Sequence, residues 1–161
     1  MAQDIIVDIQ IDEAVLARVY DDLKIQSRPK IIVSFNAKAE SAGAKLRSTS
    51  AHKKKVREFG ADLKGRYKPA DNVIEIGNQT VSFKYQSEAF ITHSVRWTLL
   101  HEIRHRWQDE QWTPDQKRRN HEGRYEERVE ELDANDFAAR HAVEYPGLVT
   151  VTTNRRAVRL P

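Results

Sequence analysis

Cysteine is absent from this sequence of 161 residues, which excludes disulfide bonds and thiolate metal ligands. A bound metal ion would therefore have to be held by histidine, aspartate or glutamate side chains. A chain without disulfides suits the reducing conditions of the cytoplasm, and we expect a cytoplasmic protein.

Long apolar segments are absent too. No run approaches the roughly 18 consecutive apolar residues that cross a bilayer as a helix. The first residues, "MAQDIIVDIQIDEAVL", carry acids among their apolar residues and no basic segment before them, so they do not form a signal peptide. We therefore expect no membrane partner.

Length and composition predict one folded domain over residues 1–161, because 39% hydrophobic and 32% charged residues are typical of a folded, strongly charged protein. The net charge is only +3, but a basic block gathers in "AHKKKVREFGADLKGRYK", residues 51–68. The part at residues 52–68 could bind nucleic acid or an acidic partner, although a basic run of this kind is most often a solvated surface.

Hydrophobic periodicity predicts an α+β protein. Segments in which apolar residues alternate with polar ones, or are mostly β-branched, are predicted to be strands. We expect strands at residues 5–11, 30–35 and 73–77, with a partner strand or an extension at 80–85 and a further strand in the tail.

Apolar residues spaced three and four apart predict helices, with Asp12 as one N-cap. Residues 36–52 have no clear period, and we interpret them as a loop or a poorly ordered helix. The helices are expected at residues 13–24, from about Ser87 to the break at 113–115, and from about Arg118 to Val143.

The stretch "LLHEIRHRWQ", residues 99–108, carries the strongest chemical signal. Positions four apart on a helix lie about 40° apart around its axis and about 6 Å along it, so His101 and His105 can aim two imidazoles at one point. Zinc accepts such nitrogens, and a catalytic site adds a third protein ligand and a water. Glu102 need not be a ligand and can take the proton of that water. The spacing suits metal-assisted hydrolysis of a peptide bond.

The same H-E-x-x-H pattern would also arise from two surface histidines on an ordinary amphipathic helix that binds no metal. With six histidines in the chain, an accidental H-E-x-x-H has a probability on the order of one in a hundred. Leu99, Leu100 and Ile103 favour burial of this helix, and burial favours the metal site over a solvated face.

The third ligand has several candidates. Glu131 follows His105 by 26 residues, which is enough for a turn and a return along an antiparallel helix. Glu127 and Glu130 compete with it, and helical phase alone does not rank the three acids. His121, 16 residues after His105, could instead supply a third imidazole, although its polar and basic neighbours equally suit a loop histidine.

Other residues near Glu131 have possible supporting roles. Small side chains at positions 134 and 138 would let the second helix approach the first closely. Asn135 or Asp133 could hydrogen-bond a ligand imidazole and so orient it. The longer motif in which a third histidine follows six residues after His105 is excluded, because Gln111 stands there.

Together, "LLHEIRHRWQ" and "ELDANDFAA" resemble the small glutamate zincins, the gluzincin group that includes the ImmA/IrrE-like metallopeptidases. The signature of that group is H-E-x-x-H on one helix and E-x-(E/D/Q)-A-x-x-F-A on the next. The resemblance covers roughly residues 65–146, while the first 60 residues match no family pattern. It implies a small sheet packed on an active-site helix and on a second helix that carries a ligand.

Residue by residue, the resemblance implies a Zn²⁺ ion held by His101, His105 and Glu131, with Glu102 as the general base. It also implies that the strand at 73–77 is the edge strand that binds an extended substrate. Arg104 departs from the pattern, since the two residues between the histidines are usually uncharged, but it could pair with an acid on the second helix such as Asp133.

A second resemblance is to the SprT-like metallopeptidases, which share the layout "GRY…VIEI…TLLHE" and use a third histidine, here His121. Their activity on DNA-associated protein would give the basic block 52–68 a role. Glu131 has the better flanking motif, so we rank it first.

The leading hypothesis is therefore a zinc endopeptidase that acts on a protein or peptide substrate. The negative charge that develops on the substrate carbonyl oxygen would need a hydrogen-bond donor, and Tyr125, His121 and Arg124 are the candidates. Two alternatives are a non-catalytic domain that binds protein or nucleic acid, and a protease held inactive by its own loop at residues 36–52.

Overall fold

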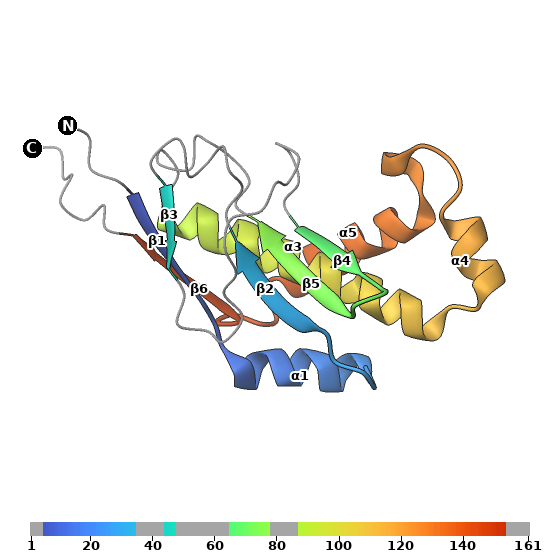
Figure 1. Ribbon diagram of the computed structural model, residues 1–161, viewed down its shortest axis with the longest axis horizontal. Helices are drawn as coiled ribbons and strands as arrows, with labels where there is room; N and C mark the ends of the chain where they lie inside the picture. Colours follow the sequence, from blue (N-terminus) through green and yellow to red (C-terminus); the bar gives the residue numbers. More distant parts are fainter. Residues whose placement is uncertain (1–4, 35–43, 48–64, 78–86, 154–161) are drawn as a thin grey trace, which may run out of the picture.

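The computed structural model describes residues 5–34, 44–47, 65–77 and 87–153 and has an α+β architecture, as predicted (Figure 1). The strands are β1 (Ile5–Ile11), β2 (Lys30–Ser34), β3 (Ala44–Arg47), β4 (Gly65–Lys68), β5 (Val73–Gly77) and β6 (Val149–Thr153). The helices are α1 (Glu13–Leu23), α3 (Glu88–Gln111), α4 (Pro114–Asn120), the 3-10 helix η2 (Tyr125–Glu127) and α5 (Val129–His141).

The strands form two three-stranded sheets, with orders β3-β1-β6 and β2-β5-β4. In the first sheet, β1 is parallel to β3 and antiparallel to β6. In the second, β5 is parallel to β2 and antiparallel to β4. Each sheet therefore contains a pairing between strands that lie far apart in the sequence, whereas β4 and β5 are neighbours along the chain.

This topology corrects the prediction that the strand at 73–77 is the edge that receives a substrate. That strand, β5, lies between β2 and β4, so its backbone groups are paired on both sides. Among the described strands, β4 is the one that ends this sheet beside α3. The sequence did not reveal this, because pairing between β2 and β5 joins residues about 40 positions apart.

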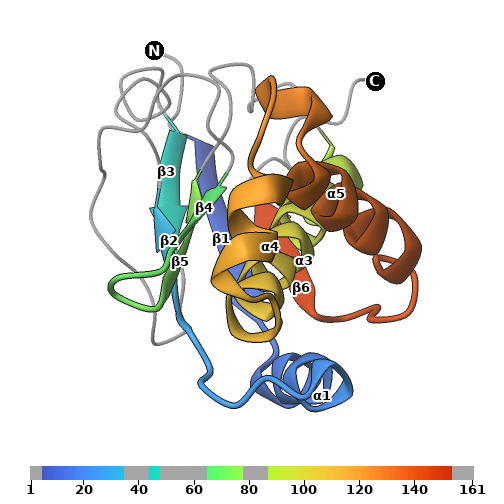
Figure 2. The ribbon, with the colours of Figure 1, turned by 90° about the vertical axis from the view of Figure 1, so that its right-hand side faces the viewer.

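The hydrophobic core lies between the sheets and α3, which contacts β4, β5 and β6. Figure 2 shows β2, β4 and β5 on one side of α3 and α5 on the other. Burial of each large aliphatic side chain contributes about 1.5–3 kcal/mol, so this layer dominates the stability of the fold. The fully buried residues of the layer include Val7, Ile31, Ile74, Ile76, Leu99, Leu100 and Ile103.

The starts of three helices follow local capping rules. Asp12 accepts hydrogen bonds from the first backbone N–H groups of α1, which confirms its predicted role as an N-cap. Ser87 caps α3 in the same way. Thr113 and Gln116 form a capping box at α4, with a proline in its first turn, so the break predicted at 113–115 is confirmed.

The prediction of one long helix from Arg118 to Val143 is wrong. The segment forms α4, then η2, then α5, which begins only at Val129. Gly123, between α4 and η2, has a φ of +94°, a left-handed conformation that does not continue a right-handed helix. The break matters for the site, because it separates His121 and Tyr125 from the helix that carries Glu131.

Other predictions about the first half of the chain have mixed outcomes. The strand at 5–11, the strand at 30–35 as far as residue 34, the helix at 13–24 and the strand in the tail are confirmed as β1, β2, α1 and β6. Within 36–52, interpreted as a loop or a poorly ordered helix, residues 44–47 form β3, so that interpretation is wrong for these four residues. The rest of 36–52, the segment 80–85 and most of the basic block, up to residue 64, lie outside the described residues.

None of the helices that the described residues form combines the length and the apolar content that crossing a membrane requires.

Gly65 offers a test of how closely β4 lies on α3. A Cβ atom at this position would sit 2.8 Å from Cγ2 of Thr98 and 3.0 Å from the carbonyl oxygen of Glu75. Gly65→Ala is expected to lower the free energy of unfolding by about 1–3 kcal/mol, measured by denaturant titration. In a Thr98→Ser background, which removes Cγ2 and keeps the hydroxyl, the loss should be smaller. An equal loss in both backgrounds would contradict the packing seen here.

Candidate metal centre

Three predicted ligands converge in the structure. Nε2 of His101 lies 3.1 Å from Oε1 of Glu131, and Nε2 of His105 lies 2.9 Å from Oε2 of the same carboxylate. The two Nε2 atoms are 3.1 Å apart. One atom of each side chain therefore faces a common point, and all three atoms lie within 4.8 Å of one another.

Two helices bring these side chains together. The histidines stand one turn apart on α3, while Glu131 stands in the first turn of α5, which packs along α3. Ala134 and Ala138 of α5 are both fully buried, which confirms the prediction that small residues allow the close approach. The imidazole of His101 stacks on Trp97, with ring centroids 5.1 Å apart, so packing as well as hydrogen bonding sets its orientation.

Pairing dominates the electrostatics of the cluster. Burial acts to raise the pKa of Glu131, but hydrogen bonds from His101 and His105 hold it far below its usual range. Burial likewise acts to lower the pKa of His105, yet the Glu131 carboxylate and the nearby Glu102 raise it to about 9. Without a metal ion, the cluster therefore keeps a carboxylate against an imidazolium at neutral pH.

Glu102 lies beside the cluster without joining it. Its side chain is buried, and its Oε1 is 3.9 Å from Nε2 of His101. Burial raises the pKa of Glu102, while His105, His101 and a hydrogen bond from the backbone N–H of Tyr67 act to lower it. A carboxylate with a raised pKa, held next to a potential metal site, has the properties of a general base.

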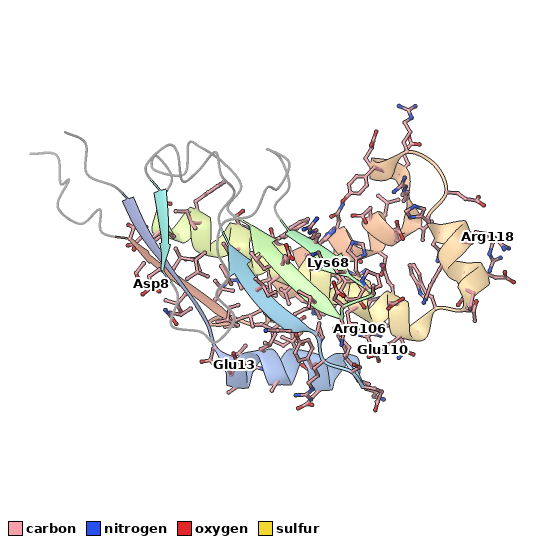
Figure 3. All side chains as sticks on the ribbon, viewed as in Figure 1. Asp8, Glu13, Lys68, Arg106, Glu110 and Arg118 are labelled. Atoms are coloured by element: carbon pink, nitrogen blue, oxygen red, sulfur yellow. The ribbon has the colours of Figure 1, made fainter. Side chains whose placement is uncertain are left out.

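The cluster opens into a cavity of about 630 Å³. Glu102, His105 and Glu131 form its inner wall, and β4, the end of α3, α4 and η2 form the rest. Its outer rim includes Arg118, which points away from the body of the molecule and is 74% exposed (Figure 3). A substrate segment could enter here and reach the cluster.

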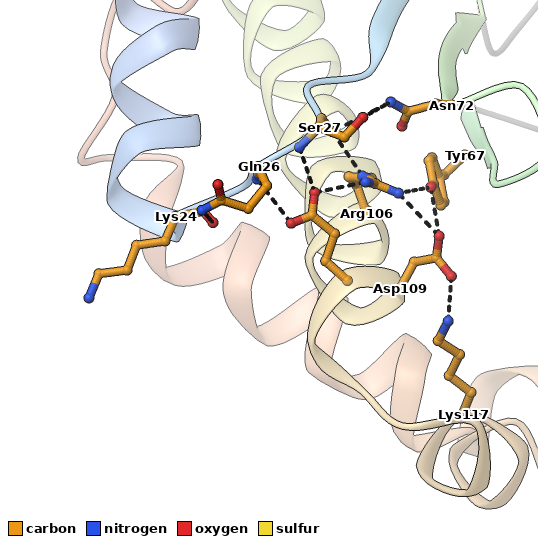
Figure 4. Close-up of polar contacts among 9 residues, drawn as sticks. Lys24, Gln26, Ser27, Tyr67, Asn72, Arg106, Asp109 and Lys117 are labelled. Carbon is orange, nitrogen blue, oxygen red and sulfur yellow. Dashed lines mark hydrogen bonds and ion pairs between the residues drawn. The ribbon is translucent and has the colours of Figure 1, made fainter.

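A polar network holds the outer walls of this cavity in place (Figure 4). The hydroxyl of Tyr67 on β4 donates to Asp109 and accepts from Arg106, both on α3. Lys117 of α4 donates to the other oxygen of Asp109, at 2.7 Å. Glu110 meanwhile accepts from Arg106 and from two backbone N–H groups just after α1. One face of α3 thus joins β4, α4 and the segment between α1 and β2.

The competing ligands do not reach the histidine pair. Glu130 points to His121 and pairs with its imidazole, and Glu127 lies on η2 with a 62% exposed side chain. His121 is itself 60% exposed; it lines the cavity but bonds to Glu130 rather than to the cluster. Of the four candidates for the third ligand, the structure brings only Glu131 to His101 and His105.

The three candidate oxyanion donors are also separated by the structure. The hydroxyl of Tyr125 hydrogen-bonds the Glu131 carboxylate, although the whole residue is 60% exposed. His121 is engaged by Glu130, and Arg124 lies at the surface near Glu127. Tyr125 is the candidate that has a polar atom at the cluster.

The sequence analysis missed one hydrogen-bond partner of the histidines. Nδ1 of His105 lies 2.9 Å from Oε1 of Gln108, whereas Asn135, one of the two predicted partners, is exposed. The other, Asp133, bonds Gln108 instead of an imidazole. The spacing of three residues between His105 and Gln108 on one helix was the available signal. The suggested pairing of Arg104 with Asp133 is confirmed, at 2.8 Å.

The donor set fits a zinc ion. Two imidazole nitrogens and one carboxylate are the ligands found in one class of catalytic zinc sites. No family model, curated protein or solved structure matches this chain. The family resemblance therefore stays a prediction.

The raised pKa of His105 predicts how zinc binding depends on pH. Below about pH 9 its imidazole is protonated in the metal-free protein, and zinc must displace that proton. Affinity is therefore expected to fall as pH is lowered, by about tenfold per unit between pH 8.5 and 6.5. Competition with a chelator of known pH dependence measures this. An affinity that does not change with pH over this range would contradict the assignment.

Proposed function

We propose that the protein is a zinc-dependent endopeptidase of the glutamate-zincin type, similar to the ImmA/IrrE-like metallopeptidases. One observation carries the proposal: His101, His105 and Glu131 converge from two helices, with the buried Glu102 beside them, at the inner end of a large cavity. We place it in the cytoplasm, because a chain without cysteine suits a reducing compartment.

The zinc ion would be held by Nε2 of His101, Nε2 of His105 and the carboxylate of Glu131. When bound, zinc supplies a Lewis acid that makes a water more acidic and polarises the carbonyl of the scissile peptide bond. Burial of His101 and Glu131 limits competition from bulk water for these positions.

Glu102 would act as the general base. Its carboxylate would take the proton of the attacking water and later deliver it to the nitrogen of the leaving amine. The raised pKa of Glu102 brings it closer to neutrality, where one group can both accept and return a proton. The backbone N–H of Tyr67 would hold the carboxylate in place during both transfers.

Tyr125 would donate a hydrogen bond to the carbonyl oxygen as negative charge develops on it. Its hydroxyl already reaches the cluster, and its exposed ring lies on the short η2 segment rather than on a long helix. A single donor of this kind contributes about 100-fold to 1000-fold in rate.

The backbone of the substrate would pair with β4 rather than with β5. Along a strand, the backbone N–H and C=O groups of residues two apart point to the same side. The N–H of Tyr67 points away from β5 and bonds Glu102, so the backbone groups of Gly65, two residues earlier, point to the same open edge of β4. An extended peptide that adds to this edge would run past the inner wall of the cavity.

The SprT-like alternative has less support. His121 pairs with Glu130, and within the basic block Arg66 and Lys68 both pair with the buried Glu75. Nucleic-acid binding by residues 52–68 stays a prediction, because residues 52–64 lie outside the described ones.

Zinc content tests the ligand set. By elemental mass spectrometry, the wild type is expected to hold about one zinc per chain. Glu131→Gln should lose it, because the amide replaces an anionic ligand, while Glu102→Gln and the matched control His121→Gln should keep it. Loss with His121→Gln, but not with Glu131→Gln, would replace this site with the SprT-like one.

Peptide hydrolysis tests the catalytic roles, with a mixed peptide library read by mass spectrometry. Glu102→Gln should abolish cleavage, and Tyr125→Phe should lower kcat/KM by about 100-fold with zinc retained. Tyr145→Phe is the matched control, since that hydroxyl bonds Asp22 away from the cavity, and it should cleave normally. If the Glu102→Gln variant cleaved peptides at the wild-type rate, the role of Glu102 as the base would be refuted.

A further inference from the structure

The side-chain amide of Gln108 has a single orientation. Gln108 is only 4% exposed, and its Nε2 lies 2.8 Å from the carbonyl oxygen of Glu130 and 2.8 Å from Oδ2 of Asp133. Both of these atoms are acceptors, so they require the NH₂ end of the amide. The oxygen of the amide must then face Nδ1 of His105, at 2.9 Å.

This orientation determines which nitrogen of His105 can bind a metal. Oε1 of Gln108 can only accept, so Nδ1 of His105 must carry a hydrogen. In the neutral imidazole, Nε2 is then the nitrogen with the free lone pair, and Nε2 is the atom that faces His101 and Glu131. The other tautomer would set two lone pairs against each other at Gln108 and point an N–H at the metal position.

Asp133 is fixed in turn by Arg104. The guanidinium of Arg104 donates from Nε to Oδ2 at 2.8 Å and from Nη2 to Oδ1 at 3.2 Å. The same guanidinium lies 3.6 Å from the centre of the Trp107 ring and 5.1 Å from that of Phe137. A planar fork that is also stacked leaves Asp133 little freedom.

We propose that Gln108 is a positioning residue for the metal site, and that Arg104 acts through Asp133 and Gln108 to keep His105 in the tautomer that binds metal. This inference rests on the proposed zinc site. It also explains why a charged residue, Arg104, stands between the two histidines of "HEIRH", where the family pattern usually has uncharged residues. Arg104 and Gln108 are not among the three proposed ligands, and His105 is the ligand whose imidazole Gln108 contacts.

Zinc affinity, measured by chelator competition, tests the role of Gln108. Gln108→Met keeps the length of the side chain and removes the acceptor, so zinc should bind about 10-fold to 100-fold more weakly. Gln108→Glu restores an acceptor for the N–H of His105 and should recover most of that loss, although it no longer donates to Asp133. A merely structural role predicts the reverse order, because a glutamate beside Asp133 disturbs packing more. Gln111→Met, on the exposed side of the same helix, should bind zinc normally.

The role of Arg104 is tested by its coupling to Gln108. Arg104→Lys loses the fork and should weaken zinc binding several-fold, but should have no further effect in a Gln108→Met background. Arg140→Lys, whose arginine pairs with Asp136 on the surface, is the matched control. Equal effects of Arg104→Lys in both backgrounds would overturn the proposed path through Gln108.

Nitrogen NMR of the zinc-loaded wild type gives a direct readout that needs no variant to fold. Nδ1 of His105 should have the shift of a protonated nitrogen and Nε2 that of a metal-bound one; the opposite assignment would overturn the inference. Wild-type affinity in Gln108→Met would also overturn it and leave the zinc site intact. Failure of the wild type to bind zinc would instead refute the proposed function, and this inference with it.

Discussion

The close packing of α5 against α3 is the constraint on which the site depends. Fully buried alanines at positions 134 and 138 leave room for the two helices to meet, and the Arg104–Asp133 ion pair links them beside the cluster. A carboxylate must come within about 3 Å of two imidazoles for all three to share a cation. A bulkier side chain at position 134 or 138 would move Glu131 away, however well α3 were formed.

Burial of two carboxylates next to two imidazoles would be costly without charge compensation. In the metal-free protein, a proton on His105 supplies that compensation, since the pKa of His105 is raised to about 9. A divalent cation at the same point would replace that proton. The cluster is thus arranged for a positive charge at its centre, and in the metal-free protein the charge on His105 acts to lower the pKa of Glu102.

The cavity around the cluster is built differently from the core. None of the residues of α4 is buried, so its place is set by polar contacts such as the one from Lys117 to Asp109 rather than by apolar packing. Asp109 also fixes Tyr67, whose backbone holds Glu102. The outer wall of the cavity and the position of Glu102 therefore depend on one face of α3, through contacts that apolar burial does not provide.

The sequence by itself determined the features that depend on neighbours along the chain: the helical spacing of His101 and His105, the cap at Asp12, the start of a helix near Ser87, and the α+β class. Each follows from the period of one element or from a few adjacent residues.

Only the tertiary structure decided the rest. Helical phase did not rank Glu131 above Glu130, because the choice depends on how α5 is rotated against α3. The family resemblance implied an edge position for β5, and nothing local in the sequence indicates that residues 30–34 pair with it. The hydrogen bond from His105 to Gln108 was within reach of helical spacing, but the orientation of that amide depends on acceptors from α5. Contacts between distant segments are set by packing, and packing is a property of the whole fold.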